Sequence, residues 1–99
     1  MNDGIGVIGL GIMGGAMAEA LIEAGYAVIG YDISSAARAR LARAGGKPLL
    51  SARAVATQAD VIITALATVS SFDEVMAQIA SAPRNARAPR RVVIETSTL

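Results

Sequence analysis

Three glycines near the start of the chain have the spacing of a phosphate-binding turn. The segment Gly9-Leu10-Gly11-Ile12-Met13-Gly14 has the pattern G-x-G-x-x-G, between a short apolar run and residues with helical periodicity. In that context Gly9 permits a tight turn, Gly11 leaves the backbone open to a pyrophosphate, and Gly14 permits close packing of helix on strand. No lysine follows as in a triphosphate-binding P-loop. The turn therefore predicts a dinucleotide site, where free N–H groups and the helix dipole attract phosphates.

An acidic residue stands where such a site needs one. Asp32 ends the second apolar run, about 20 residues after the turn. A carboxylate there accepts hydrogen bonds from both ribose hydroxyls of an adenosine and repels a 2′-phosphate, which favours NAD over NADP. Asp32 could instead cap the following helix. NADP also stays open, because three nearby residues could hold a 2′-phosphate if Asp32 turned away: Ser34, Ser35 and Arg38.

The elements that must position these residues follow from alternating strand and helix signals. Apolar runs without polar alternation indicate strands that are buried on both faces, joined through helices by right-handed crossovers. We therefore expect an α/β fold of Rossmann type, a doubly wound parallel sheet of about five strands. The expected strands are residues 5–8, 26–31, 48–50, 61–66 and 91–95, and the expected helices are residues 12–24, 34–44, 51–59 and 71–81.

Local signals refine the helices. Ser34 and Ser51 are candidate helix caps, and the spacing from Ser71 to Glu74 predicts a capping box at the start of the last helix. Gly25 predicts the end of the first helix. The predicted apolar face of that helix contains Ile12, Ala16, Met17, Ala20, Leu21 and Ala24.

The composition excludes several other kinds of function. The 99 residues contain neither cysteine nor histidine, so there is no disulfide framework, thiolate site or imidazole base, and we expect no metal site. The lack of cysteine fits a reducing compartment, and we expect a cytoplasmic protein. No apolar run approaches the roughly 20 residues of a membrane span. The net charge of +1 and the lack of interleaved aromatic residues argue against nucleic-acid binding by the arginines Arg84, Arg87, Arg90 and Arg91.

Taken together, these motifs resemble the β-hydroxyacid dehydrogenases, which include 3-hydroxyisobutyrate dehydrogenase, tartronate semialdehyde reductase and the 6-phosphogluconate dehydrogenases. The likeness covers nearly the whole chain. It implies a Rossmann domain, residues 1–99, joined to an all-helical second domain that completes the substrate site. It also implies hydride transfer between a nicotinamide cofactor and a β-hydroxyacid or its semialdehyde. The residues that carry the likeness are residues 9–14, Met17-Ala18, Leu21, residues 25–28, residues 59–62 and residues 94–98.

The resemblance implies roles for further residues. The backbone of Leu10, Ile12 and Met13 would lie along the pyrophosphate. Hydroxyl residues after the last strand would lie beside the nicotinamide (Thr96) and the substrate carboxylate (Ser97). A loop against the two riboses would contain Leu66, Ala67 and Thr68, although the family usually has proline where this sequence has Ala67.

The resemblance also implies that no catalytic residue lies in this chain. The family's catalytic lysine and its substrate-binding glycine motif come after the point where the chain ends, and Lys47 stands in a glycine-rich turn. We therefore expect binding of NAD, or of NADP, without turnover. A hydroxyacid would bind only together with the missing helical domain, and the longer protein would form a homo-oligomer. Two alternatives are a dinucleotide-sensing regulatory domain and a flavin-binding Rossmann domain, although the latter usually has Glu where this chain has Asp32.

Overall fold

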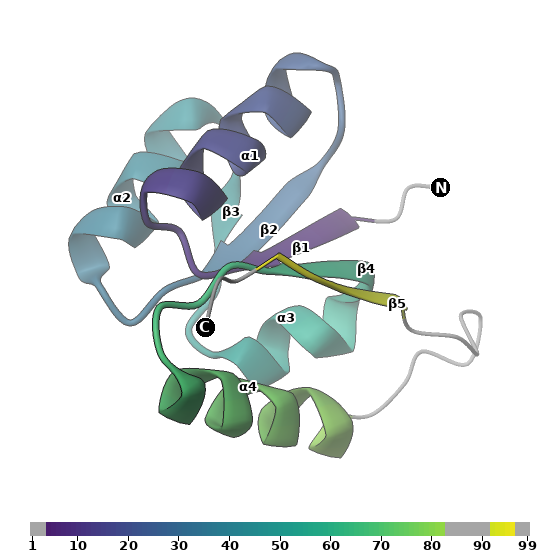
Figure 1. Cartoon of the computed structure of the whole chain (residues 1–99). Helices are drawn as coiled ribbons and strands as arrows, with labels where there is room; N and C mark the ends of the chain where they lie inside the picture. The colour runs from purple at the N-terminus through teal and green to yellow at the C-terminus, as the bar shows by residue number, and fades with distance from the viewer. Residues whose placement is uncertain (1–3, 83–91, 97–99) are drawn as a thin grey trace.

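Strands and helices alternate along residues 4–82 and 92–96, which are the residues that the computed structural model describes. The strands form one parallel sheet in the order β3-β2-β1-β4-β5. Helices α1 and α2 cover one face of it, and α3 and α4 cover the other (Figure 1). The strands are β1 (Gly4–Ile8), β2 (Val28–Tyr31), β3 (Lys47–Pro48), β4 (Ala59–Thr64) and β5 (Val92–Glu95). The helices are α1 (Ile12–Glu23), α2 (Ser35–Ala44), α3 (Ala52–Gln58) and α4 (Val69–Ser81).

This arrangement confirms the doubly wound α/β fold. From β1 the chain first builds outward through β2 to β3, and it then crosses to the other side of β1 to form β4 and β5. The strand order therefore reverses at the carboxyl end of β1. In open parallel sheets the crevice at such a reversal is the usual place for a ligand.

Both faces of the sheet are buried. Val7 of β1 and Val28 of β2 pack against Ala18 of α1 and Leu41 of α2. The alternate residues of the same strands, together with Ile62 of β4, face the buried side chains of α3 and α4. Because successive strand residues point to opposite faces, the unbroken apolar runs of the sequence serve two cores at once.

Helix α1 turns a different face to the sheet from the predicted one. Gly14 and Ala18 are its buried residues, and Leu21 and Ile22 pack partly against the core. Ile12, by contrast, is 96% exposed. The close contact of Gly14 with the strand fixes the rotation of the helix, so residues four and seven or eight positions further on face inward. The other residues of the predicted face that are exposed are Ala16, Ala20 and Ala24.

Several boundaries also differ from the predicted ones. Strand β4 ends at Thr64 rather than at residue 66, and α4 begins at Val69 rather than at residue 71. Its cap is Thr68, whose hydroxyl accepts a hydrogen bond from the N–H of Ser71 at 3.0 Å, and the predicted capping box at Ser71 is wrong. Strand β3 lies at residues 47–48 rather than 48–50. The caps at Ser34 and Ser51 are confirmed.

Some predictions concern residues outside the described part of the chain. These residues are the four arginines at positions 84, 87, 90 and 91, and the substrate-binding candidate Ser97. Within residues 4–82 and 92–96, no helix has both the length and the apolar character that crossing a membrane requires. The same residues contain no group of acidic side chains that could hold a metal ion.

Candidate functional site

The glycine turn joins β1 to α1 at the carboxyl edge of the sheet, where two of its glycines are required by the fold. Gly9 has a φ of +96°, and a Cβ on it would lie 2.2 Å from the carbonyl oxygen of Ala65. A Cβ on Gly14 would lie 1.7 Å from the carbonyl oxygen of Gly9. The structure thus confirms the tight turn at Gly9 and the close approach of helix and strand at Gly14.

Gly11 differs, because nothing in the fold requires a glycine there. Its φ is −73°, which every residue can adopt, and a Cβ on it would meet no described atom within 4 Å. Gly11 caps α1 without a side-chain acceptor, and the first N–H bonded within the helix is that of Gly15, to the carbonyl of Gly11 at 2.8 Å. In the described part of the chain, the N–H groups of Ile12, Met13 and Gly14 therefore lack a partner. Free donors beneath open space form a backbone cradle for an anion.

Asp32 lies directly beside this cradle. Its Oδ2 accepts a hydrogen bond from the N–H of Leu10 at 2.7 Å, and its Oδ1 accepts one from the N–H of Ser34 at 2.8 Å. Ser34 is the cap of α2, since its hydroxyl accepts from the N–H of Ala37, so Asp32 does not cap that helix. Each carboxylate oxygen keeps a further lone pair, so Asp32 is fixed in place and still able to accept hydrogen bonds from a ligand.

The residues considered for a 2′-phosphate are partly engaged elsewhere. Arg38 donates from Nη1 to the carbonyl oxygens of Asp32 at 2.8 Å and Ile33 at 3.3 Å, so its guanidinium supports the loop after β2. The hydroxyl of Ser34 is used as the helix cap. These bonds hold the loop between β2 and α2 in place.

A cleft of about 310 Å³ opens beside the turn, at the carboxyl ends of β1, β2 and β4. It brings together five of the predicted site residues, which are Gly9, Gly11, Asp32, Leu66 and Ala67. Its charged side chains are those of Asp32 and Glu74, both acidic. An uncharged, hydroxyl-bearing group such as a nucleoside therefore suits the cleft, while phosphates suit the adjoining N–H groups.

Eight further residues line the cleft without having been predicted as site residues. Four stand at the ends of β1, β2 and β4, and four stand on α4: Ile8, Tyr31, Ile33 and Ala65, and Ser71, Glu74, Val75 and Gln78. Those on α4 are three or four residues apart, which is the spacing of one helical face. That periodicity could have identified them once the loop before α4 had been placed at the site.

The other predicted site residues lie around the cleft rather than in its wall. Leu10 is buried in the core and offers its N–H to Asp32, while Ile12 and Met13 are exposed on the first turn of α1. The hydroxyl of Thr68 caps α4. Thr96 follows β5 and donates from its hydroxyl to the carbonyl oxygen of Thr64 at 2.8 Å. The buried Thr64 in turn donates from its own hydroxyl to the carboxylate of Glu95.

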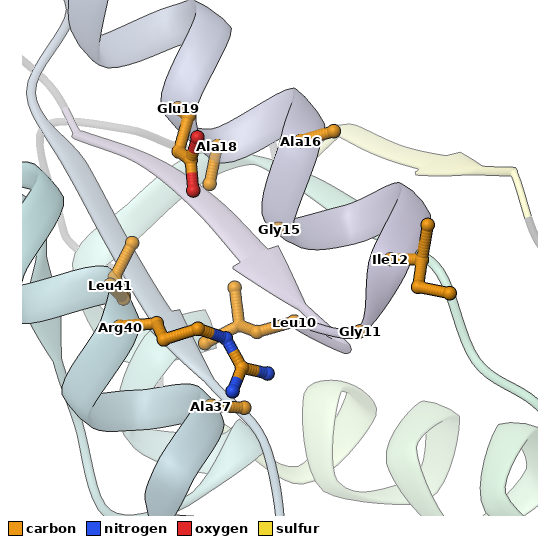
Figure 2. Close-up of a pocket in the computed structure, with 10 residues that line it drawn as sticks. All are labelled: Leu10, Gly11, Ile12, Gly15, Ala16, Ala18, Glu19, Ala37, Arg40 and Leu41. Atoms are coloured by element: carbon orange, nitrogen blue, oxygen red, sulfur yellow. The ribbon is translucent and has the colours of Figure 1, made fainter.

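A second hollow, of about 330 Å³, lies between α1 and α2 on the other side of the turn (Figure 2). Figure 2 shows the side chain of Arg40 extending across it toward Gly11, with Glu19 on the opposing helix. One acid and one base leave this hollow without net charge. It lacks Asp32 and the loop after β4, so the cleft beside α4 is the better candidate site.

The chain is similar to the NAD-binding parts of known oxidoreductases. Residues 4–99 match the family model described as the NAD binding domain of 6-phosphogluconate dehydrogenase. The chain is 33% identical over 99 residues to L-threonate dehydrogenase of Cupriavidus necator, covering all of this chain and 33% of that protein. It is 45% identical over 62 residues, 63% of this chain, to the probable mitochondrial 3-hydroxyisobutyrate dehydrogenase of Dictyostelium discoideum, and covers 19% of it.

A solved structure has the same fold. Mycobacterium tuberculosis 3-hydroxyisobutyrate dehydrogenase, solved with L-serine, superposes with a TM-score of 0.86 at 33% identity, over 99% of this chain and 32% of that chain. The chain thus spans about a third of the length of L-threonate dehydrogenase and of this structure.

Proposed function

The chain belongs to the family of NAD-binding domains found in 6-phosphogluconate dehydrogenase, and from that premise we propose that it binds the dinucleotide cofactor of a hydride-transferring oxidoreductase. The observation that carries this proposal is the open cradle at Gly11. The fold accounts for Gly9 and Gly14, whereas the absence of a side chain at Gly11 is explained by a group that approaches the backbone from outside. A pyrophosphate on the free N–H groups of α1 meets that requirement.

We propose NAD rather than NADP as the cofactor. Asp32 presents a fixed carboxylate beside the turn, and its remaining lone pairs suit the ribose hydroxyls of adenosine. A 2′-phosphate at the same place would meet like charge, while Arg38 is held by two backbone carbonyls. Both the charge and the hydrogen bonding therefore favour the unphosphorylated ribose.

This chain's own residues bind and orient the cofactor, and the nicotinamide, when bound, supplies the carbon that gives or accepts the hydride. Leu66 and Ala67 line the cleft beyond Asp32, on the loop that leads from β4 to α4. Lys47 is exposed at the start of the edge strand β3 and lines no part of the cleft. We therefore propose that the group which protonates or deprotonates the substrate comes from the rest of a longer protein.

For that longer protein we propose a β-hydroxyacid dehydrogenase or semialdehyde reductase with an added helical substrate domain. L-threonate dehydrogenase and the 3-hydroxyisobutyrate dehydrogenases are named for hydroxyacid substrates, and the chain spans about a third of the former. In that setting Ser97 would bind the substrate and Thr96 would lie near the nicotinamide. We further propose a cytoplasmic homo-oligomer, the location resting on the absence of cysteine.

Calorimetric titration of this chain with NAD, NADP, FAD and ATP tests the proposal. NAD is expected to bind most tightly of the four, with NADP weaker. Tightest binding of FAD would favour a flavin-binding domain, and binding of none would show that the turn has no dinucleotide function. In the longer protein, NAD binding without oxidation of any hydroxyacid would favour a regulatory domain instead.

Asp32→Asn is expected to weaken NAD binding by about 10- to 100-fold and to reduce the preference for NAD over NADP. The change keeps the size of the side chain but removes its charge, and hydrogen bonds to a charged group contribute about 1.5–3 kcal/mol. Asp73→Asn removes the same charge from an exposed position of α4 that does not line the cleft, and it should leave both affinities unchanged. If Asp32→Asn left the ratio of NAD affinity to NADP affinity unaltered, Asp32 would only hold the turn in place and would not select the cofactor.

A further inference from the structure

We propose that helix α4 recognises the base of the bound dinucleotide through two side chains one helical turn apart. In this arrangement Glu74 accepts a hydrogen bond from the amino group of adenine, and Gln78 donates one to the neighbouring ring nitrogen N1. The inference rests on the proposed function, since it takes a dinucleotide in the cleft as given. It goes further by assigning base selectivity to residues that no sequence motif marks.

The two side chains share the wall of the cleft. Residues four apart lie on the same face of an α-helix, and both Glu74 and Gln78 line the cleft with Asp32. Val75, between them in sequence, is 8% exposed and packs into the core, which holds this turn of α4 against the sheet. The polar pair is therefore presented from a fixed element rather than from a loop.

A hydrogen bond to α3 determines which group Gln78 can offer. Its Oε1 accepts from the N–H of Arg53 at 3.2 Å, across the interface where α3 and α4 lie side by side on the same face of the sheet (Figure 1). The carboxamide oxygen is thus engaged at the first turn of α3, and the NH₂ group remains to donate to a ligand. Glu74 is exposed and offers only acceptors. The wall consequently presents one acceptor and one donor.

Apolar residues also border this part of the cleft. Ile33 directly follows Asp32 and is 87% exposed, while Leu66 and Ala67 belong to the loop before α4. A ribose held by Asp32 would direct its base past Ile33 and toward α4. Such apolar surfaces suit the faces of a planar base, which leaves its polar edge for the side chains of α4.

The donor and acceptor pattern of the wall matches adenine and opposes hypoxanthine. Adenine has an amino donor at N6 and an acceptor at N1, which complement the carboxylate of Glu74 and the amide NH₂ of Gln78. Hypoxanthine has a carbonyl oxygen and an N–H at the same two positions. It would place an oxygen against the carboxylate and an N–H against the amide donor. Both contacts would be unfavourable in the same ligand.

Calorimetric titration with NAD and with nicotinamide hypoxanthine dinucleotide tests the inference directly, because the two ligands differ only in that edge of the base. The unaltered chain is expected to bind NAD at least about 10-fold more tightly. The exchange variant Glu74→Gln with Gln78→Glu keeps the net charge and reverses donor and acceptor. It is expected to reverse the preference, while Asp73→Asn should leave the ratio unchanged.

The outcomes separate this inference from the proposed function. Equal affinity for both dinucleotides would overturn base recognition by α4 and leave dinucleotide binding intact, whereas binding of neither would overturn both. An exchange variant that folds, as measured by circular dichroism, but still prefers NAD would also overturn the inference. If that variant does not fold, Gln78→Met replaces it, because it removes the donor with little change in size. Gln78→Met is expected to lower the preference for NAD severalfold, and an unchanged ratio would exclude Gln78 from base recognition.

Discussion

Replacement of Gly11 by valine is expected to abolish measurable NAD binding while the domain remains folded. A Cβ at this position enters open space, and the backbone φ of −73° is accessible to valine. The two γ-carbons would occupy the space above the free N–H groups of Ile12 and Met13, so a pyrophosphate could not reach them. We expect a loss of at least about 100-fold in affinity, corresponding to roughly 3 kcal/mol.

Thermal and chemical denaturation test whether the Gly11→Val variant remains folded. Because the new Cβ meets no described atom within 4 Å, the free energy of unfolding should change by less than about 1 kcal/mol. Ala20→Val is the matched control, since it places the same branched side chain on the exposed face of α1. It should leave the affinity for NAD unchanged. Unaltered NAD affinity in Gly11→Val would make the turn a purely structural feature.

The fold could be predicted from the sequence where a local rule was decisive. The apolar runs, the glycine turn and the serine caps each report a constraint within a few residues, and the structure has the expected strand and helix order. The roles of Gly9 and Gly14 belong to the same class, because a strand that turns directly into a helix forces a close backbone approach.

Other features could not be predicted, because the packing of whole elements decided them. Helix α1 is rich in apolar and small residues, so its pattern favoured a face that the structure leaves largely exposed, and packing of Gly14 and Ala18 on the sheet selected another. The spacing from Ser71 to Glu74 predicted the start of the last helix, whereas β4 ends at Thr64 and α4 begins at Val69 with Thr68 as its cap.

At the candidate site, too, some features could be predicted from local sequence and others depend on contacts between distant residues. Asp32 could be found from its distance to the glycines, but its bond to the N–H of Leu10 spans 22 residues and follows only from the pairing of β1 with β2. Glu74 and Gln78 line the same cleft as Ile33 although they come from a distant part of the chain, and no local pattern records that proximity.

Gly14→Ala is expected to destabilise the domain far more than the same change at the neighbouring Gly15. The added Cβ would lie 1.7 Å from the carbonyl oxygen of Gly9 and 3.3 Å from the Cβ of Ala65. A backbone oxygen cannot move aside as a flexible side chain can, so α1 and the end of β1 must separate. Overpacking of this kind costs about 1–3 kcal/mol or more. For a domain of this size that lowers the melting temperature by roughly 4–8 °C per kcal/mol.

Gly15→Ala is the control that isolates this contact, because it adds the same methyl group at the next position of the same helix. Its Cβ would lie 3.1 Å from the carbonyl oxygen of Leu10, a contact that a small shift relieves, and alanine favours the helix by up to about 1 kcal/mol. We therefore expect its stability to stay within about 1 kcal/mol of the unaltered chain. Equal stability of the two variants in urea denaturation would contradict the steric role of Gly14. The expected contrast, with Gly14→Ala unfolding early and Gly11→Val folded but unable to bind, would assign one glycine of the turn to the fold and another to the ligand.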